Sequence, residues 1–396
     1  MTELAAHGIA ELSDTKNAIG ESLQLAIENQ LNVVATINER GAANARLNRN
    51  EEALELFKRA LEMLQSVLGK GHVSTTELID NIGIILVATR KYDAAILRFE
   101  EAKAIRMNSH SANHPSLATS AANIGETCRK MGRFESAVCY FKEATAICES
   151  SYGTSHPTSA QMLESLGQAN HNLGEYEAAL DNYQNVLTVK ELLYGLGHLE
   201  TADTIHNMAV TYQALGHYER AMHLFKQALG VYQENGLPPG RTANALKNIA
   251  ITYSRQGDHK NAIDYFRRAL NIETREFGVE HINTANTLNN LGAAYGRVGK
   301  FDEAISRCRT ALEITIRYNG PGHVDVATAH HNLGMMKLSQ GFVKEAKKHF
   351  KESHQIFVAS FGVQHPKSCR ERKLVRTVGK LARSTKSGRL RTRIIR

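Results

Sequence analysis

Small, apolar and aromatic positions recur along this chain with a fixed period. Each unit has an anchor, the small residue that closes a triplet of the form Asn-(Ile, Leu or Met)-(Gly or Ala), and successive anchors lie 41 or 42 residues apart. Eight such units span residues 30–366, and a period of this length is typical of stacked repeat architectures. The anchors are Gly41, a degenerate first member, and Gly83, Gly125, Gly167, Ala209, Ala250, Gly292 and Gly334.

The pattern inside each unit predicts two helices joined by a tight turn. Counted from the anchor, alanine occupies position +12 in every unit, aromatic residues are usual at +9 and +16, and glycine occupies +7 in six units. Positions +9, +12, +16 and +19 share one helix face, so we expect helix A, a glycine turn, helix B with a buried face, and a linker. No segment alternates apolar and polar residues, so the predicted fold class is all-α. The alanines are Ala53, Ala95, Ala137, Ala179, Ala221, Ala262, Ala304 and Ala346.

The linkers carry a second recurring signal, an aromatic-Gly-x-x-His-Pro pattern that is complete at residues 152–157 and 361–366. All six prolines lie in linkers, where proline is accepted as the first residue of a helix. Histidines at equivalent places in successive repeats are too far apart for one tetrahedral metal site, so we expect them to form hydrogen bonds at the linkers and helix starts. They are His72, His114, His156, His198, His281, His323 and His365.

These positions resemble the tetratricopeptide repeat, and most closely its 42-residue kinesin light chain type. The stretches Thr287-Leu288-Asn289-Asn290-Leu291-Gly292 and Gly299-Lys300-Phe301-Asp302-Glu303-Ala304 carry the resemblance, which covers about 330 of 396 residues. It implies a right-handed superhelical solenoid of about eight helix-turn-helix repeats with a concave, peptide-binding face. Kinesin light chains also have a long coiled coil before the repeats, whereas residues 1–29 predict only a short capping segment before the solenoid of residues 30–366. Motor attachment through such a coiled coil is therefore not expected.

Asparagine recurs at position −2 of helix A, although it is a poor helix former. Its amide both donates and accepts hydrogen bonds, so a ladder of asparagines can hold the backbone of an extended peptide whatever its side chains are. The alternative is that each asparagine bonds to the neighbouring helix and fixes the stacking of the repeats; both roles can coexist. The ladder consists of Asn81, Asn123, Asn207, Asn248, Asn290 and Asn332, with Ser165 as the exception.

Charged residues on the same stripe of helix A predict a preference among peptides. Position +5 carries Lys130, Arg255 and Arg297, and Lys247 lies next to the ladder, whereas Glu77, Glu126 and Asp203 lie nearer the first half. We interpret the cations as a weak preference for acidic peptide segments, which the light chain resemblance also implies. Ordinary solvated surface charge is the alternative.

The net charge of +8 is concentrated at the C-terminus. Residues 367–396 hold twelve basic residues and one acid, so 36 basic and 39 acidic residues, a net of −3, remain for the rest. This basic tail suits acidic protein tails such as those of tubulin, an anionic membrane, or nucleic acid, although it lacks aromatic residues for base stacking. A solubilising or nuclear-localising tail is the remaining alternative. The candidate contacts are Arg370, Arg372, Lys373, Arg376, Lys380, Arg389, Arg391 and Arg393.

Other function classes lack a signal in the sequence. There is no phosphate-binding, nucleophile-elbow, kinase or metal-ligand motif, so no enzyme activity, catalytic residue, metal or cofactor is expected. Five cysteines without a CxxC pair fit a reducing compartment such as the cytoplasm. The sequence predicts a non-enzymatic adaptor that binds peptide segments. The alternatives are a microtubule- or cilium-associated structural protein, in contact with tubulin or with a motor or axonemal complex, and a nucleic-acid-binding repeat protein.

Overall fold

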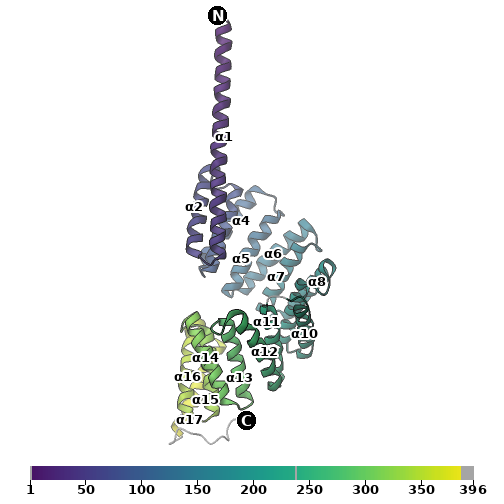
Figure 1. Ribbon diagram of the computed structural model, residues 1–396, viewed down its shortest axis with the longest axis vertical. Coiled ribbons are helices and arrows are strands. Elements are labelled where there is room, and N and C mark those ends of the chain that lie inside the picture. The colour runs from purple at the N-terminus through teal and green to yellow at the C-terminus, as the bar shows by residue number, and fades with distance from the viewer. Residues whose placement is uncertain (1, 237–238, 385–396) are drawn as a thin grey trace. The chain divides into compact units, whose positions relative to one another are not determined.

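The computed structural model describes the backbone of residues 2–236 and 239–384, and the side chains of residues 24–236 and 240–382. These residues form helices and no strand, which confirms the predicted all-α fold (Figure 1). Two compact units divide the chain, Met1–Leu193 (the N-terminal unit) and Tyr194–Arg396 (the C-terminal unit). The first contains α1 (Thr2–Arg46), α2 (Asn50–Leu68), η1 (Val73–Thr75), α3 (Thr76–Ala88), α4 (Tyr92–Ser109), α5 (Pro115–Met131), α6 (Phe134–Tyr152), α7 (Pro157–Leu173) and α8 (Tyr176–Tyr194). The second contains α9 (Leu199–Ala214), α10 (Tyr218–Glu234), α11 (Pro239–Arg255), α12 (His259–Phe277), α13 (Ile282–Arg297), α14 (Phe301–Asn319), α15 (Val324–Ser339), α16 (Val343–Phe361) and α17 (Pro366–Ser384).

Each repeat is a pair of packed helices built around the predicted small and aromatic positions. All eight alanines at +12 are fully buried, and the aromatic residues at +16 are at most 2% exposed. The +16 ring lies against the anchor: a Cβ atom at Gly83 would come within 2.5 Å of the Phe99 ring, and one at Gly167 within 2.8 Å of Tyr183. Helices A and B therefore approach closely because one side supplies a small residue and the other a ring.

The turn between helices A and B takes a left-handed backbone at position +7 in every repeat. The six glycines predicted there all have positive φ, between 78° at Gly132 and 97° at Gly174. The two repeats without glycine adopt the same conformation with Asn48 (φ 58°) and Arg90 (φ 60°). A Cβ atom is disfavoured in this region, least so for asparagine, so Arg90 is held there by the repeat geometry.

The linker histidines cap the next helix, as the sequence predicts. The Nδ1 atom of each accepts a hydrogen bond, 3.2–3.3 Å long, from the backbone N–H two residues later. Several of these rings also stack on the aromatic residue four positions earlier, for example Phe361 on His365 with the centroids 4.5 Å apart. Because Nδ1 accepts, it carries no proton. The histidine thus caps the start of a helix A, except that His72 caps the short η1 that precedes α3.

The two ends of the chain extend the repeat pattern. The capping segment predicted at 1–29 and helix A of the first repeat are parts of one continuous helix, α1. At the other end, the basic tail begins in α17, which packs against α16 as a ninth helix A. Within the described residues, no helix is long and apolar enough to cross a membrane.

Candidate peptide-binding surfaces

The candidate site is the stripe of helix A formed by positions −6, −2, +1 and +5. In the N-terminal unit α3, α5 and α7 supply it, and in the C-terminal unit α9, α11, α13 and α15 do so. All residues of the predicted ladder are half-buried. Each of these side chains is therefore partly accessible from outside the protein.

The amide nitrogens of three ladder residues bond to helix A of the preceding repeat, always at its position −3. Asn81 donates through Nδ2 to Oδ1 of Asn38 (3.1 Å), and Asn332 donates in the same way to Oδ1 of Asn289 (3.0 Å). Asn248 Nδ2 lies 3.1 Å from Nε2 of His206. Burial lowers the pKa of His206 to about 4, so this ring is neutral and its Nε2 can accept. The stacking role is thus present in these repeats.

Ser165 is the one ladder position without asparagine, and the preceding repeat offers no partner for an amide there. Its neighbour at position −3 is Ala122, which has no side-chain acceptor. An asparagine at 165 would therefore find no acceptor at that place, and the Ser165 hydroxyl instead donates to the backbone carbonyl of Gln161 in its own helix (3.1 Å). A missing acceptor does not by itself require serine, because Asn290 also follows a repeat whose position −3, Lys247, offers no side-chain acceptor.

Position −3 also carries buried ion pairs that the sequence analysis missed. In the second, fourth and sixth repeats, residue −3 pairs with residue +23 on helix B. The pairs are Asp80–Arg106 (2.6 Å), Glu164–Lys190 (2.8 Å) and Lys247–Glu273 (2.7 Å), the last with reversed sign. The signal was present in the sequence as opposite charges 26 residues apart within one repeat.

This ion pairing corrects the interpretation of Lys247 as a groove cation. Its side chain is 16% exposed and its ammonium binds the buried carboxylate of Glu273. A carboxylate in the interior needs a cation beside it, so the charge of Lys247 is directed into the repeat and away from the groove.

Of the three predicted cations at +5, two are exposed and have no carboxylate partner among the described residues, Arg255 and Arg297. Lys130 lies 3.7 Å from Glu126, a carboxylate that Arg129 also binds through two hydrogen bonds of 2.7 Å. Arg255 is exposed and contacts the backbone carbonyl of Gln213 at 3.4 Å. Arg297 is exposed and makes no ion pair with any described side chain. The cationic part of the candidate site is therefore in the C-terminal unit.

Two acidic residues of the stripe bond to neighbouring side chains. Glu77 accepts a hydrogen bond from Nδ2 of Asn38 (3.2 Å). Asp203 accepts one from the Tyr232 hydroxyl (2.7 Å) and pairs with Arg241 at 2.8 Å. The charge of Asp203 is therefore balanced by Arg241, whereas the exposed Glu77 keeps its negative charge in the N-terminal unit.

The predicted contacts of the basic tail fall into two groups. Five lie on α17, and four of them, all except Arg372, are exposed: Arg370, Arg372, Lys373, Arg376 and Lys380. The other three, Arg389, Arg391 and Arg393, lie outside the described residues.

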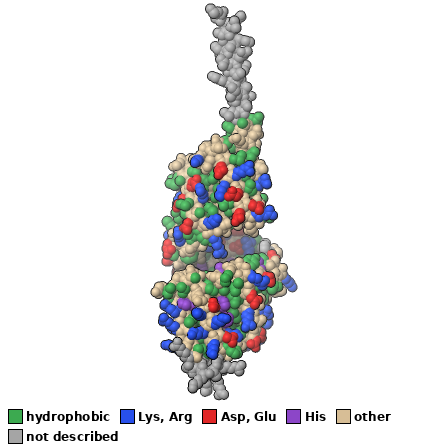
Figure 2. Space-filling model, turned by 90° about the vertical axis from the view of Figure 1, so that its left-hand side faces the viewer, with side chains coloured by type: hydrophobic (Ala, Val, Ile, Leu, Met, Phe, Trp, Pro, Cys, Tyr) green, Lys and Arg blue, Asp and Glu red, His purple; other side chains and the backbone are tan. Residues whose placement is uncertain are grey.

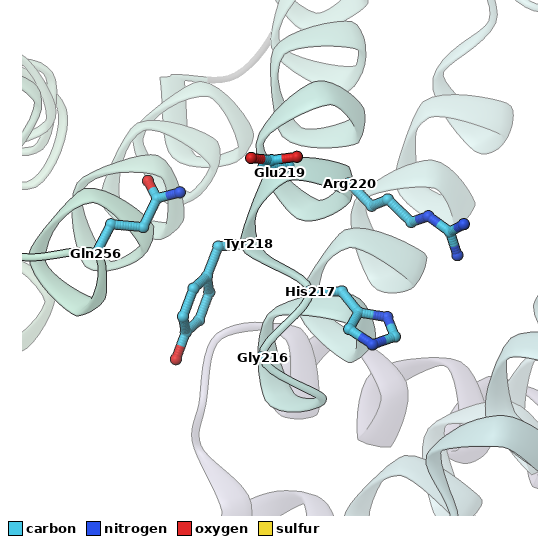
Figure 3. Close-up of a pocket in the computed structure, with 6 residues that line it drawn as sticks. All are labelled: Gly216, His217, Tyr218, Glu219, Arg220 and Gln256. Atoms are coloured by element: carbon cyan, nitrogen blue, oxygen red, sulfur yellow. The ribbon is translucent and has the colours of Figure 1, made fainter.

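The C-terminal unit has a surface pocket of about 500 Å³. It lies at the turn before α10 and is lined by Gly216, His217, Tyr218, Glu219, Arg220 and Gln256. In Figure 3 the side chains of His217, Glu219 and Arg220 point in different directions. They share no point at which a reacting atom could sit between a nucleophile and a base. In the described part of the chain, no group of three or more His, Cys, Asp or Glu residues could hold a metal ion.

Known proteins agree with this repeat architecture. The tetratricopeptide repeat family model matches residues 33–108, 91–150, 158–234, 241–316 and 287–357. Among solved structures, BtubC (BKLC) from P. vanneervenii is 22% identical, with 58% of this chain and 92% of that chain covered and a TM-score of 0.48. A Podosopora anserina protein with nearly identical kinesin light chain TPR-like repeats is 20% identical (52% and 98% covered, TM-score 0.45). Apo RapI is 14% identical (76% and 99% covered, TM-score 0.56). No curated protein matches the sequence significantly.

Proposed function

The chain belongs to the tetratricopeptide repeat family, and from this premise we propose that it is a non-enzymatic adaptor that binds extended peptide segments on the inner stripe of its A helices. Repeats of this kind present an extended surface and no catalytic centre, and their general use is protein–protein interaction. The candidate site lies on rigid helices, which hold their side chains in place before a ligand arrives.

The orientation of the ladder amides is the observation that supports this function. Asn38 donates through Nδ2 to the carboxylate of Glu77, which can only accept, so Oδ1 of Asn38 must face Asn81. Asn81 therefore uses its amide nitrogen between repeats, and its Oδ1 accepts no hydrogen bond from the described residues. The same holds for Oδ1 of Asn248 and Asn332. A row of fixed carbonyl acceptors suits the N–H groups of a peptide backbone.

The surrounding charges favour acidic peptides in the C-terminal unit. Arg255 and Arg297 are the exposed cations of the stripe there, and the nearby carboxylate Asp203 is neutralised by Arg241. An extended peptide that bonds to the ladder amides of this unit would thus place its Asp or Glu side chains near Arg255 and Arg297, where no unpaired carboxylate of the stripe opposes them.

Asn290 offers a clean test of the peptide-binding role. Its side chain forms no hydrogen bond with any described residue. Asn290→Ala therefore removes an amide that can contact a peptide and breaks no hydrogen bond within the described protein. Its neighbour Asn289 accepts from Asn332 and is the matched control, because Asn289→Ala disturbs stacking at the adjacent position. The probe is a random-sequence peptide library selected on the whole chain, followed by titration of the enriched peptides.

We expect Asn290→Ala to lower the affinity for the enriched peptides about fivefold to tenfold, which corresponds to the loss of one hydrogen bond. The melting temperature should not change. Asn289→Ala should lower the melting temperature and affect binding less. The enriched peptides should be rich in Asp and Glu. Unchanged peptide affinity in the Asn290→Ala protein would contradict the peptide-binding role of the ladder.

The basic tail at residues 367–396 supports a separate set of predictions. A microtubule or ciliary role through tubulin or a motor or axonemal complex, a cytoplasmic location and nucleic-acid binding all stay predictions. Cosedimentation with microtubules, before and after proteolytic removal of the acidic tubulin tails, tests the cytoskeletal role. Binding that persists on trimmed microtubules would contradict it.

A further inference from the structure

The last two helices of the chain share an outer face made of cations. On α17 the exposed side chains include Lys367, Arg370, Lys373, Arg376 and Lys380, and on α16 they include Lys344, Lys347, Lys348 and Lys351. The two rows adjoin: a Cβ atom at Gly379 of α17 would lie 3.4 Å from Cε and Nζ of Lys347 on α16. We call these nine residues the cationic face. Figure 2 shows Lys and Arg side chains gathered on the C-terminal unit.

The acids of these two helices do not neutralise this face. The single acid of α17, Glu371, is fully buried beneath it, where one carboxylate oxygen lies 2.8 Å from Nδ1 of His331 on α15. On α16, Glu345 pairs with Lys337 of α15 at 2.7 Å, and Glu352 is only half-exposed. Among the described residues, one member of the cationic face forms an ion pair: Arg370 lies 3.3 Å from the carboxylate of Glu371. The other eight cations are adjacent and have no ion pair with a described carboxylate. They repel one another, and an anionic partner would relieve that repulsion.

The chemistry of the face distinguishes among anionic partners. Seven of its nine members are lysines, flexible point charges without the planar fork that grips a phosphate in two places. Within residues 344–355 and 367–380 every exposed side chain is polar or charged, so these residues offer no ring for base stacking and no apolar group for insertion into a lipid interface. At their margin lies one exposed ring, Phe361, whose centroid is 5.7 Å from Nζ of Lys367. A flexible chain of carboxylates can adapt to two rows of lysines on a convex surface, whereas a rigid duplex needs a matching shape.

We infer that the cationic face on α16 and α17 binds an acidic polypeptide segment. This site is distinct from the inner stripe of the A helices and does not depend on it. It also differs from a role for the tail as a whole, because the contacts are placed on two folded helices and include four lysines that precede the tail.

Fluorescence anisotropy of a labelled poly-glutamate peptide with the full chain tests the inference. One variant changes Lys347, Lys348 and Lys351 to Gln, which removes charge from α16 and keeps helix propensity. A second changes Arg370, Arg376 and Lys380 to Gln, and a third ends the chain at residue 384. The matched control removes three exposed cations from the N-terminal unit: Arg59, Lys91 and Lys142, each to Gln.

We expect each triple variant of the cationic face to weaken poly-glutamate binding about tenfold, and the control to leave it within about twofold. Affinity should fall with added salt. Truncation at residue 384 should preserve most of the binding. The inference is overturned if the truncation alone abolishes binding, if the control variant weakens it equally, or if a DNA duplex or phosphatidylserine vesicles bind more tightly than poly-glutamate.

Discussion

Replacing Arg106 by methionine probes the buried ion pairs at positions −3 and +23. In the native protein the Arg106 guanidinium donates to Asp80 and to the hydroxyl of Ser120, both at 2.6 Å, and the side chains of the pair are 8% and 10% exposed. Methionine keeps the apolar stem but leaves the Asp80 carboxylate buried without its cation. Breaking such a pair costs about 3–5 kcal/mol, which for a unit of this size lowers the melting temperature by roughly 6–20 °C.

The loss of stability should depend on pH in a defined direction. Burial raises the pKa of Asp80 above its ordinary value even with Arg106 present, and Arg106 opposes the rise. Without Arg106 the pKa of Asp80 rises further, so the folded state binds a proton more tightly than the unfolded state does. Stability is then lost as the pH rises through the folded-state pKa, and the deficit of the Arg106→Met protein should shrink as the pH falls from 7 towards about 4.5.

Thermal unfolding followed by circular dichroism across this pH range measures both effects. The double variant Asp80→Leu with Arg106→Met removes both charges, and it should regain most of the lost stability because apolar side chains can replace a buried pair at little cost. A deficit that is independent of pH and persists in the double variant would refute the electrostatic explanation and indicate a packing defect instead.

Three further predictions concern the anchors, the turns and a buried histidine. Gly83→Ala should cost about 1–3 kcal/mol of unfolding free energy because its Cβ would come within 2.5 Å of a ring, whereas Gly125→Ala, at 3.3 Å, should be close to neutral in the same denaturant titration. Arg90→Gly should stabilise the N-terminal unit by about 0.5–1 kcal/mol. Glycine removes the steric cost of a positive φ, and this gain is larger than the free energy lost through the greater conformational entropy of the unfolded chain. A lower denaturation midpoint would contradict this. His206 has a folded-state pKa of about 4, so the unfolded chain alone takes up a proton between about pH 6.5 and 4 and stability falls as the pH is lowered. His206→Gln, which cannot titrate, should flatten that part of the pH profile.

The sequence predicted the helical framework because small and large residues at fixed offsets are direct consequences of close packing. Ala53 and its seven equivalents are buried at every repeat, and the linker histidines cap helices as expected. The residues beside the ladder were harder to interpret. Lys247 resembles a surface cation in a helical sequence, and only the position of Glu273 on the partner helix shows that its charge is internal. The side on which each ladder amide places its oxygen depends on the residue one repeat earlier, so it could not be predicted from a single repeat.

The bonds between Asn81 and Asn38, and between Asn332 and Asn289, have a consequence for how such a chain can be recombined. The boundaries of a repeat are usually drawn in its loops, but these pairs join position −2 of one repeat to position −3 of the repeat before it. Exchanging whole repeats at their loops would separate the two partners. The two partners lie 43 residues apart, so no module of 42 residues contains both. A cut in a loop separates one such pair, and a cut inside helix A between positions −3 and −2 separates two. Repeats can therefore be shuffled, duplicated or deleted without loss of these bonds only where the residues at −3 and −2 match across each new junction.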